Sequence, residues 1–480
     1  MIRDNFFGGD AMTESRDNYI SPLAGRYAGA QMRYLFSDQY KFRTFRRLWL
    51  MLAEAEQQLG LPISDEQLAE LRAHLDDIDF AAAEAKEKQI RHDVMAHVYA
   101  YGLVCPTARP IIHLGATSAY VDDNADILIF TAALDIIEAR LFAVVRALAA
   151  FADRYKDAPC LGYTHFQPAQ PVTIGKRAAL WLQDFADDID DLRYLRGSLR
   201  PLGCKGTTGS GASFLALFDG DAARVQQLDQ LIAEKMGFSE PVDVSGQTYS
   251  RKTDARLLGL LSGVAQSASK FATDIRLLQH EGELSEPRQA AQVGSSAMPY
   301  KRNPMRAERI CALARYIITD ALNPALTAAS QWLERSLDDS ANRRIAMAEG
   351  FLACDAVLNL VADISGGLEA HCDKALENLA AELPFMATEN LMMRAVKAGG
   401  DRQELHEKIR RYAQNGAAEL LRLIAADADF GLDEQELAQL LDPAAYTGVA
   451  ARQVQRLLTR RIEPLLASYQ GQTIETKVEV

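Results

Sequence analysis

Apolar residues recur at alternating spacings of three and four along three long stretches of the chain. The second stretch runs from Leu257 to Leu278, and a third, less regular one runs from Leu180 to Leu199. This spacing places apolar side chains on one face of an α-helix. The first stretch, residues 123–152, carries its apolar positions at Ile127, Phe130, Leu134, Ile137, Leu141, Val144, Leu148 and Phe151.

Helices of this length predict a bundle. The first stretch would extend for about eight turns, which is more than a small globular helix requires. Long apolar seams often continue across subunits, so the pattern favours an oligomer built on a shared helical core. A single bundle within one chain, without an oligomer, is the alternative.

Other segments support an all-α fold. A helical pattern from Phe36 to Gln58 ends at Gly60 and Pro62, which are typical helix terminators. The β-branched run at 108–114 is an isolated strand signal, and no alternation of strands with helices predicts a parallel sheet. Polar, glycine-containing breaks interrupt the helical pattern at 203–213, near 245 and at 294–309. The first 20 residues are polar and are expected to form a loose tail.

Composition narrows the class of protein. The chain has 480 residues and a formal net charge of -13, with a pI near 5.2. This charge disfavours nucleic acids and anionic membranes as partners, because both need a basic face. The six cysteines are scattered without a CxxC pair, and no uninterrupted apolar run approaches the length of a membrane span. We therefore expect a cytoplasmic protein. No dinucleotide-binding or P-loop motif is present.

Two of the eight histidines are candidates for acid–base chemistry. His92 and His165 have polar, non-periodic neighbours, and His165 lies in a segment bounded by glycine and proline. For a single histidine a structural role is the more common one, and the role of His113 stays open. His92 and His97 would project about 140° apart on a helix, which is poor geometry for a shared metal ion.

Two basic breaks could bind anions. The segment 294–309, GSSAMPYKRNPMRAER, leads into a helix whose first N–H groups and positive dipole end could face an anion, with Lys301 and several arginines nearby. A solvated charged loop is the alternative. Residues 334–344 offer Arg335, Ser340, Arg343 and Arg344, and three arginines with a hydroxyl suit carboxylate or phosphate groups. Ion pairs with Asp338 and Asp339 are the competing interpretation there.

These motifs resemble a known family. GSSAMPYKRNP resembles the signature loop of the fumarase/aspartase superfamily. Together, RHDVMAH, IIHLGATS, THFQPAQ, KGTTG, SGQTYSRK, LDDSANRR and PFMATEN resemble its adenylosuccinate lyase family, from about residue 21 to the C-terminal helices. The resemblance implies an all-α fold with three domains, at 1–117, 118–370 and 371–480. It also implies a homotetramer around a central long-helix bundle, with each active site collected from three subunits.

The reaction implied by the resemblance is elimination of fumarate from succinyl-nucleotides. Adenylosuccinate would give AMP, and the related succinyl-carboxamide ribotide would give the free carboxamide. Ser295 would be the base and His165 the acid, with Glu308 near His165. Lys301 would bind the succinyl carboxylate. No metal or organic cofactor is implied, because the substrate carboxylate accepts the electrons.

The resemblance also implies a set of substrate contacts. His92, with Arg91 and Asp93, would meet the phosphate end of the substrate. Thr117 and Ser118 would bind carboxylate, and Gln247 would orient the substrate. The remaining contacts would be Arg26, Tyr27, Ser340 and Arg344 at the phosphate, and Arg309 and Arg335 elsewhere on the ligand.

Three alternatives share parts of this pattern. Argininosuccinate lyase, fumarase or aspartase would share the signature loop but should lack the phosphate set around Arg26 and Arg344. A non-catalytic scaffold on the same fold is disfavoured because His165 and Ser295 are both present. A hydrolase using Ser295 and Lys301 would need an oxyanion-hole motif, and the sequence offers no clear one.

Overall fold

Helices make up nearly all the regular structure, which confirms the all-α prediction. The computed structural model describes residues 18–288, 296–298, 300–432 and 434–471. The first part contains η1 (Leu23–Tyr27), α1 (Ala30–Leu35), α2 (Asp38–Gln58), α3 (Asp65–Ala73), α4 (Phe80–Ile90), α5 (Asp93–Val104) and η2 (Arg109–Ile111). The middle part contains α6 (Ser118–Arg154), α7 (Ile174–Gly197), α8 (Ala212–Leu217), α9 (Ala222–Lys235), α10 (Lys252–His280), α11 (Met305–Asp320), α12 (Leu322–Ser330) and α13 (Asp339–Gly367). The last part contains α14 (Cys372–Met386), α15 (Thr388–Lys397), α16 (Arg402–Tyr412), η3 (Ala413–Asn415), α17 (Ala417–Ala426), α18 (Glu434–Leu440), η4 (Pro443–Tyr446), α19 (Ala450–Leu457), η5 (Leu458–Ile462) and α20 (Glu463–Ala467).

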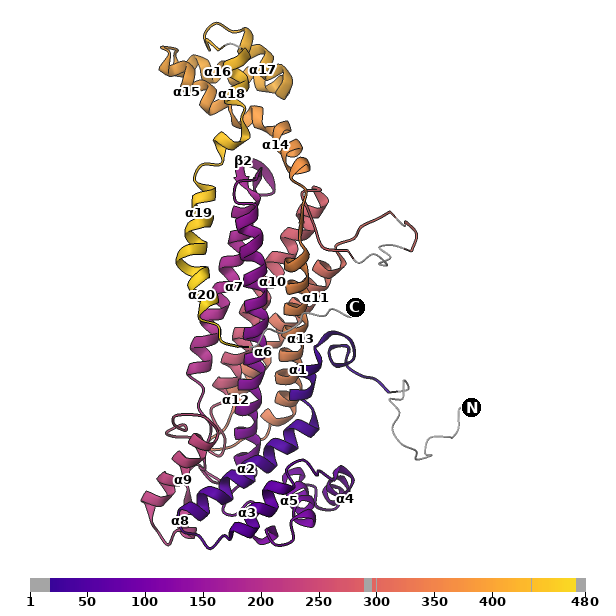
Figure 1. Ribbon diagram of the computed structural model, residues 1–480, viewed down its shortest axis with the longest axis vertical. Coiled ribbons are helices and arrows are strands. Elements are labelled where there is room, and N and C mark those ends of the chain that lie inside the picture. The colour runs from indigo at the N-terminus through magenta and orange to yellow at the C-terminus, as the bar shows by residue number, and fades with distance from the viewer. Residues whose placement is uncertain (1–17, 289–295, 299, 433, 472–480) are drawn as a thin grey trace.

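The long helices α6, α7, α10, α11 and α13 lie side by side along the molecule (Figure 1). The apolar stripe predicted at 127–151 is buried throughout, as the helical spacing indicates; it lies in the main core from Phe130 to Phe151, while Ile127 belongs to a small separate cluster. The prediction for the third stretch, from Leu180 to Leu199, is less accurate. Leu180 at its start is 47% exposed, whereas Phe185, Ile189 and Leu192 are buried. The three predicted stretches lie in α6, α7 and α10, so these helices of the bundle are the ones that the sequence pattern predicts.

Helix α13 was not evident in the sequence pattern, although it lies in the centre of the bundle. It is apolar on most sides, so it lacks the polar face that makes a helix recognisable by periodicity. Within the described ranges it is the one helix long and apolar enough to cross a membrane, and 83% of its most apolar window is buried inside the protein. It is a core helix of the bundle.

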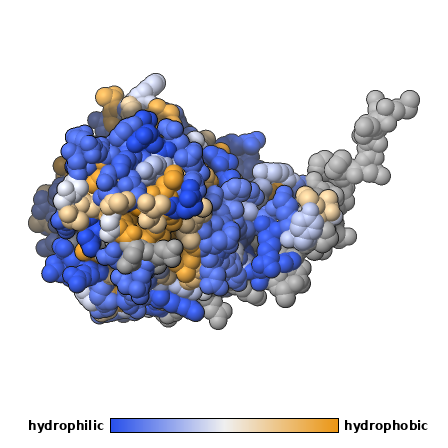
Figure 2. All heavy atoms as spheres, turned by 90° about the horizontal axis from the view of Figure 1, so that it is seen from above, coloured by the Kyte–Doolittle hydropathy of each residue, from blue (hydrophilic) through white to orange (hydrophobic). Residues whose placement is uncertain are grey.

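Smaller helices gather at the two ends of the bundle (Figure 1). Helices α2, α3, α5, α8 and α9 share a second apolar core with the start of α6, and α15–α18 share a third. Figure 2 looks onto the α15–α18 end, where a mostly hydrophilic surface surrounds hydrophobic positions gathered near its middle. Helices α19 and α20 return along the bundle, and Val454 and Leu465 pack in its core. The domain boundaries at residues 117 and 370 stay a prediction.

Two short antiparallel sheets complete the fold. Strands β1 (Pro159–Thr164) and β2 (Gln167–Thr173) form a hairpin in which Thr164 pairs with Gln167. Strands β3 (Leu284–Ser285) and β4 (Glu369–Ala370) join the end of α10 to the end of α13. The β-branched run at 108–114 contains the 3-10 helix η2 instead of a strand. Pro110 within that run has no N–H to donate to a β-ladder.

Candidate active site

The residues predicted from the sequence fall into separate groups within one chain. His92 caps α5, which lies at the end of the bundle where α2, α3 and α4 also pack, whereas β2 of the His165 hairpin lies toward the other end (Figure 1). Ser118 contacts His92, and Arg344 contacts the neighbouring Asp93. Tyr27 and the start of α11 form a third neighbourhood.

The first group joins α5, α6 and α13. His92 is the N-cap residue of α5, where its Nδ1 accepts from the N–H of Met95 at 3.4 Å. The Nε2 atom of His92 lies 3.3 Å from Oγ of Ser118, the first residue of α6. Arg344 of α13 donates to Oδ2 of Asp93 at 3.0 Å, and its side chain is 64% exposed. The structure therefore brings together residues that are 251 positions apart in the sequence.

The surroundings of Asp93 favour the charged form of its carboxyl group. Burial alone would raise the pKa of its carboxyl, but the N–H of Val94 and the charges of Lys41 and Arg344 outweigh burial and lower that pKa. Asp122, on the first turns of α6, differs, because burial raises its pKa to about 7, with Lys41 opposing and Asp93 adding to the shift. Lys41 and Asp122 were not identified from the sequence. They sit inside regular helical patterns, so no local signal marks them.

Arg91 and Thr117, two further predicted contacts, lie at helix ends next to this group. Arg91 ends α4 in the left-handed region, with φ 56° and ψ 39°, and its side chain is exposed. Such a conformation is uncommon for a residue other than glycine, and is more frequent at functional sites. Thr117 is the N-cap residue of α6, and its side chain makes no capping hydrogen bond. Its hydroxyl is therefore not used to terminate the helix.

Tyr27 and Arg309 form the third neighbourhood. The guanidinium carbon of Arg309, in α11, lies 5.6 Å from the centroid of the Tyr27 ring, and that of Arg26 lies 5.9 Å from it. The segment is held next to the bundle by Gly29, whose N–H donates to Oδ2 of Asp355 at 2.6 Å. Asp355 is itself paired with Arg140 in the buried core. This places two predicted anion-binding residues near the signature segment.

Of the signature segment, 294–309, the structure describes residues 296–298 and 300–309. Ser295, the predicted base, lies outside the described residues. Lys301 is exposed and its N–H donates to the carbonyl of Met298 at 3.0 Å. Glu308 is exposed on the first turn of α11. Within the described residues of one chain, no hydrogen bond joins Glu308 to His165.

The start of α11 corrects one expectation. Its first N–H groups do not face an open anion site, because Glu286 accepts from Arg306 at 3.2 Å and from Ala307 at 3.1 Å. Arg306 is also unavailable for ligand, since it is buried and bonds the carbonyl of Pro287 and the carboxylate of Asp363. The protein's own carboxylate therefore occupies this helix terminus. In the described part of this segment, Lys301 and Arg302 remain exposed.

Gln247 and Arg335 lie on two segments that touch. The N–H of Gln247 donates to the carbonyl of Glu334 at 2.9 Å, and its side-chain amide donates to the carbonyl of Thr207 at 3.1 Å. Arg335 donates to both oxygens of Asp339, at 2.8 and 2.9 Å. The competing interpretation, an ion pair with a neighbouring aspartate, is therefore correct for Arg335. Ser340 follows Asp339 at the start of α13 and is half-buried.

His165 lies at the tip of the β1–β2 hairpin. Both turn residues, His165 and Phe166, have positive φ values of 53° and 57°. A two-residue hairpin with both residues in this region is the type I′ geometry, which usually requires glycine or asparagine. The hairpin is anchored by Arg177, which donates to the carbonyl of Leu161 at 2.5 Å and pairs with the buried Glu283 at 3.2 Å. The strained turn thus presents an exposed imidazole from a rigid support.

Other histidines have structural partners. His97 is buried and stacks on Phe42 with ring centroids 3.4 Å apart, and burial lowers its pKa to about 4. Nδ1 of His113 accepts from the indole N–H of Trp49 at 2.9 Å, and burial with the nearby His92 lowers the pKa of His113 to about 4. The described residues contain no cluster of three or more acidic, histidine or cysteine side chains that could hold a metal ion.

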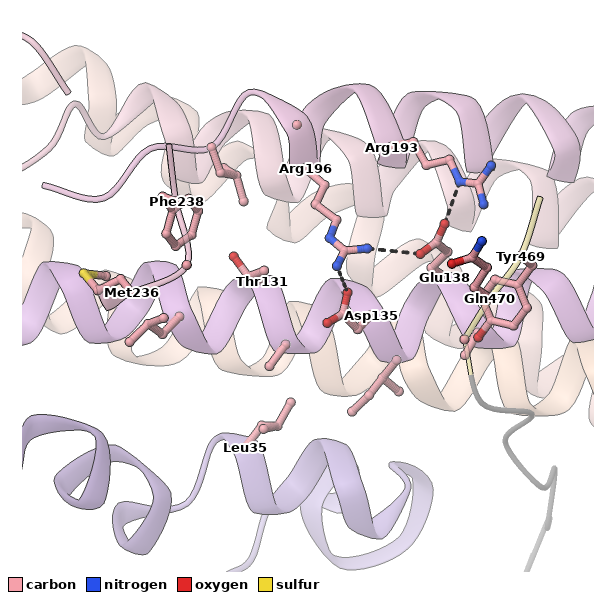
Figure 3. Close-up of a pocket in the computed structure, with 18 of the residues that line it drawn as sticks. Leu35, Thr131, Asp135, Glu138, Arg193, Arg196, Met236, Phe238, Tyr469 and Gln470 are labelled. Atoms are coloured by element: carbon pink, nitrogen blue, oxygen red, sulfur yellow. Dashed lines mark hydrogen bonds and ion pairs between the residues drawn. The ribbon is translucent and has the colours of Figure 1, made fainter. Parts of the chain in front are cut away.

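An open cavity of about 1150 Å³ lies away from these groups, between α1, α6, α7 and residues 468–471. Figure 3 shows that its arginines point at acidic side chains of α6. Arg193 pairs with Glu138 at 2.6 Å, and Arg196 pairs with Asp135 at 2.6 Å. None of the residues predicted for substrate binding lines this cavity. It is therefore not the candidate active site.

Comparisons with known proteins identify the family. A family model described as lyase matches residues 39–319, and one described as adenylosuccinate lyase C-terminus matches residues 384–457. The adenylosuccinate lyases of Schizosaccharomyces pombe and Saccharomyces cerevisiae are each 44% identical to this chain, over 97% of it and 99% of the relative. The crystal structure of a fumarate lyase from Mesorhizobium sp. BNC1 matches with a TM-score of 0.79 and 27% identity, covering 91% of this chain and 99% of that one. The chain therefore belongs to the adenylosuccinate lyase family, within the fumarase/aspartase superfamily of lyases.

Proposed function

We propose that the chain eliminates fumarate from adenylosuccinate, giving AMP, and from the related succinyl-aminoimidazole carboxamide ribotide, in the cytoplasm. The observation that carries this proposal is the 44% identity to adenylosuccinate lyases over 97% of the chain. The two substrates share the succinyl group and the ribose phosphate, so one site can bind both.

The chemical difficulty of this reaction is charge. A base removes a proton from the carbon next to a succinyl carboxylate, and the electron pair left behind delocalises into that carboxylate. The C–N bond then breaks as the electrons form the double bond of fumarate, and the departing nitrogen receives a proton. Cationic groups arranged in advance around the carboxylate are the most effective way to lower this barrier.

Ser295 and His165 are the proposed base and acid. A serine hydroxyl is a poor base unless a nearby cation stabilises its alkoxide, and Lys301 is an exposed cation of the same segment. His165 must start as an imidazolium, and Glu308 is the carboxylate proposed to stabilise it. Because the two groups lie on different segments, they can act from opposite sides of the substrate, as an anti elimination requires.

We propose that the group around His92 binds two parts of the substrate. These are the nucleotide phosphate and the second carboxylate of the succinyl group. His92, Arg91 and Arg344 supply donors for the phosphate, while Thr117 and Ser118 supply hydroxyls at the N-terminus of α6 for carboxylate. The hydrogen-bond distance between His92 and Ser118, 3.3 Å, supports placing both on one ligand.

The separation of these groups within one chain supports a site shared between subunits of a homotetramer. Large apolar side chains between α12 and the start of α13 are exposed in the single chain, and they flank Arg335, Ser340 and Arg344. An exposed apolar patch of this kind usually marks a protein–protein contact. Its members and their exposed fractions are Leu322 63%, Leu326 69%, Trp332 74%, Leu333 98%, Leu337 73% and Ile345 63%.

Purified protein incubated with adenylosuccinate tests the proposal. We expect equimolar AMP and fumarate, with no turnover of argininosuccinate, malate or aspartate. Turnover of one of these three in place of adenylosuccinate would assign the chain to a different activity of the superfamily. A folded protein inactive on all four would favour a non-catalytic role.

A further inference from the structure

Arg251 lies at the centre of a buried ion network, where α6, α10 and α13 begin. It is the N-cap residue of α10, and its side chain is 2% exposed. Its Nη1 and Nη2 donate to the two carboxylate oxygens of Asp123, in α6, at 3.0 and 3.1 Å. Its Nε donates to Oδ2 of Asp339, the first residue of α13, at 2.7 Å. One guanidinium thus binds two helices.

Each of these aspartates also holds a second group. Oδ2 of Asp123 accepts from the backbone N–H of Tyr249 at 2.8 Å, which fixes the strand-like approach to α10. Asp339, whose side chain is fully buried, accepts two hydrogen bonds from Arg335. The network therefore runs without a break from α6 through Arg251 to Arg335.

The three segments joined in this way carry the proposed substrate contacts. Asp123 lies five residues after Ser118 on α6, and Arg251 lies four residues after Gln247. Asp339 directly precedes Ser340 on the helix that also carries Arg344.

We propose that Arg251 is a positioning residue for substrate binding, which fixes the segments of Ser118, Gln247 and Arg335 relative to one another. This inference rests on the proposed function and on the substrate contacts that the family resemblance implies for Ser118 and Gln247. Arg251 is buried beneath the site, so its effect on substrate acts through the segments that it joins.

Stability alone does not explain this network. Removing charged groups from water costs several kcal/mol for each ion, and well-packed apolar side chains of similar volume often stabilise a protein as well or better. What an arginine fork adds is fixed geometry, because its planar donors match two carboxylates at once. A lysine has the charge but cannot bind both aspartates in the same way.

The surrounding chain leaves little room for the segments to adjust independently. A Cβ atom on Gly246 would lie 2.4 Å from the carbonyl oxygen of Glu334, so the Gln247 segment passes directly against the chain that leads to Arg335. The ring of Tyr249 lies between two guanidinium groups, 4.7 Å from that of Arg251 and 5.6 Å from that of Arg343. A shift at Arg251 is therefore transmitted to both neighbouring segments.

The test replaces Arg251 by lysine and compares it with Arg46→Lys. Arg46 is a matched control, because it is 1% exposed and donates to the carbonyls of His74 and Asp77, in the α2–α4 region rather than the network. The measurements are the KM for adenylosuccinate, kcat per folded chain, the Kd for AMP by calorimetry, and thermal unfolding.

Arg251→Lys is expected to raise the KM and the AMP Kd about tenfold, because ligand groups displaced by a fraction of an ångström lose much of their binding. Its kcat per folded chain should fall by less. Arg46→Lys should lower the unfolding temperature to a similar extent and leave the KM unchanged. A folded Arg251→Lys enzyme with wild-type KM and Kd would overturn the positioning role.

A second variant keeps the test decisive if Arg251→Lys does not fold. Asp123→Asn retains an oxygen that can accept the Tyr249 N–H but removes the charge that pairs with Arg251. We expect the same rise in KM, and an unchanged KM would overturn the inference. Absence of turnover by the wild-type enzyme would instead refute the proposed function, so the two failures are distinguishable.

Discussion

The carboxylate of Glu286 accepts a hydrogen bond from the backbone N–H of Ala307, at 3.1 Å, and thereby joins the two ends of the signature segment. Gln279 adds a second link, since its side chain accepts from the N–H of Glu286 and donates to the carbonyl of Arg302, each at 3.2 Å. The segment that carries Ser295 thus begins and ends at fixed points on α10 and α11.

Replacing Glu286 by glutamine should loosen this connection. A glutamine side chain has one acceptor oxygen, so it can satisfy only one of the two N–H groups at the start of α11. We expect the free energy of unfolding to fall by about 1 kcal/mol, as for loss of a helix N-cap. The measurement is denaturant unfolding, together with kcat, which should also fall. Glu281→Gln, at the C-terminal end of α10, is the control. Equal stability of the two variants would contradict the role of the Glu286 carboxylate in holding the start of α11.

Alanine at Gly29 should disturb the segment of Arg26 and Tyr27. Its Cβ would lie 2.8 Å from Nη2 of Arg140 and 3.0 Å from Oδ2 of Asp355, both in the core. We expect a loss of stability of about 1–3 kcal/mol, as for overpacking, and a higher KM. Gly25→Ala is the matched control, because its Cβ would meet only Ile20, at 3.5 Å. Identical unfolding and KM values for the two variants would show that the Gly29 contact is unimportant.

Glu56 makes stability depend on pH. It is fully buried in α2, and neither carboxylate oxygen has a hydrogen-bond partner among the described residues. Burial raises its pKa from 4.5 to about 8, so the folded protein holds a proton that the unfolded chain releases above pH 4.5. The contribution of this group to stability is therefore fully present below about pH 4.5 and is lost as pH rises through 8.

Glu56→Gln should remove that dependence, because an amide does not titrate. Relative to wild type, the variant should gain stability progressively from pH 5 to pH 8, by up to roughly 5 kcal/mol if the whole pKa shift is expressed. Thermal or denaturant unfolding across this range measures the gain. A constant difference between the two proteins at every pH would refute the assignment.

The sequence predicted the parts of the fold that repeat regularly. The stripe from Ile127 to Phe151 was sufficient to predict α6, because its apolar face contrasts with a polar one. Helix α13 has no such contrast, and its burial depends on neighbours far apart in the chain. The I′ turn at His165 was also not predictable, since neither His165 nor Phe166 is a typical residue for positive φ.

The site was predictable in its residue types but not in its arrangement. Motif resemblance indicated His92, Ser118 and Arg344, which the structure brings together. Capture of the α11 terminus by Glu286 depends on a contact across 21 residues, and the pairing of Arg251 with Asp123 on one across 128. Local sequence patterns contain no signal for contacts of that range.

Single substitutions test the two proton-transfer roles. Ser295→Ala and His165→Ala should each lower kcat by a factor on the order of 100 or more, as for loss of a general base or acid. Steady-state turnover of adenylosuccinate, with circular dichroism to confirm folding, measures the effect. A folded Ser295→Ala enzyme with wild-type kcat would mean that another group is the base.

Mixing these two inactive variants tests most directly whether sites assembled from several chains carry out the elimination. Equal amounts of Ser295→Ala and His165→Ala protein are combined under conditions of proven subunit exchange, and turnover of adenylosuccinate is measured. Some sites in the mixed tetramers then contain both Ser295 and His165, so partial activity should return. Continued inactivity of fully exchanged tetramers would contradict a site shared between chains.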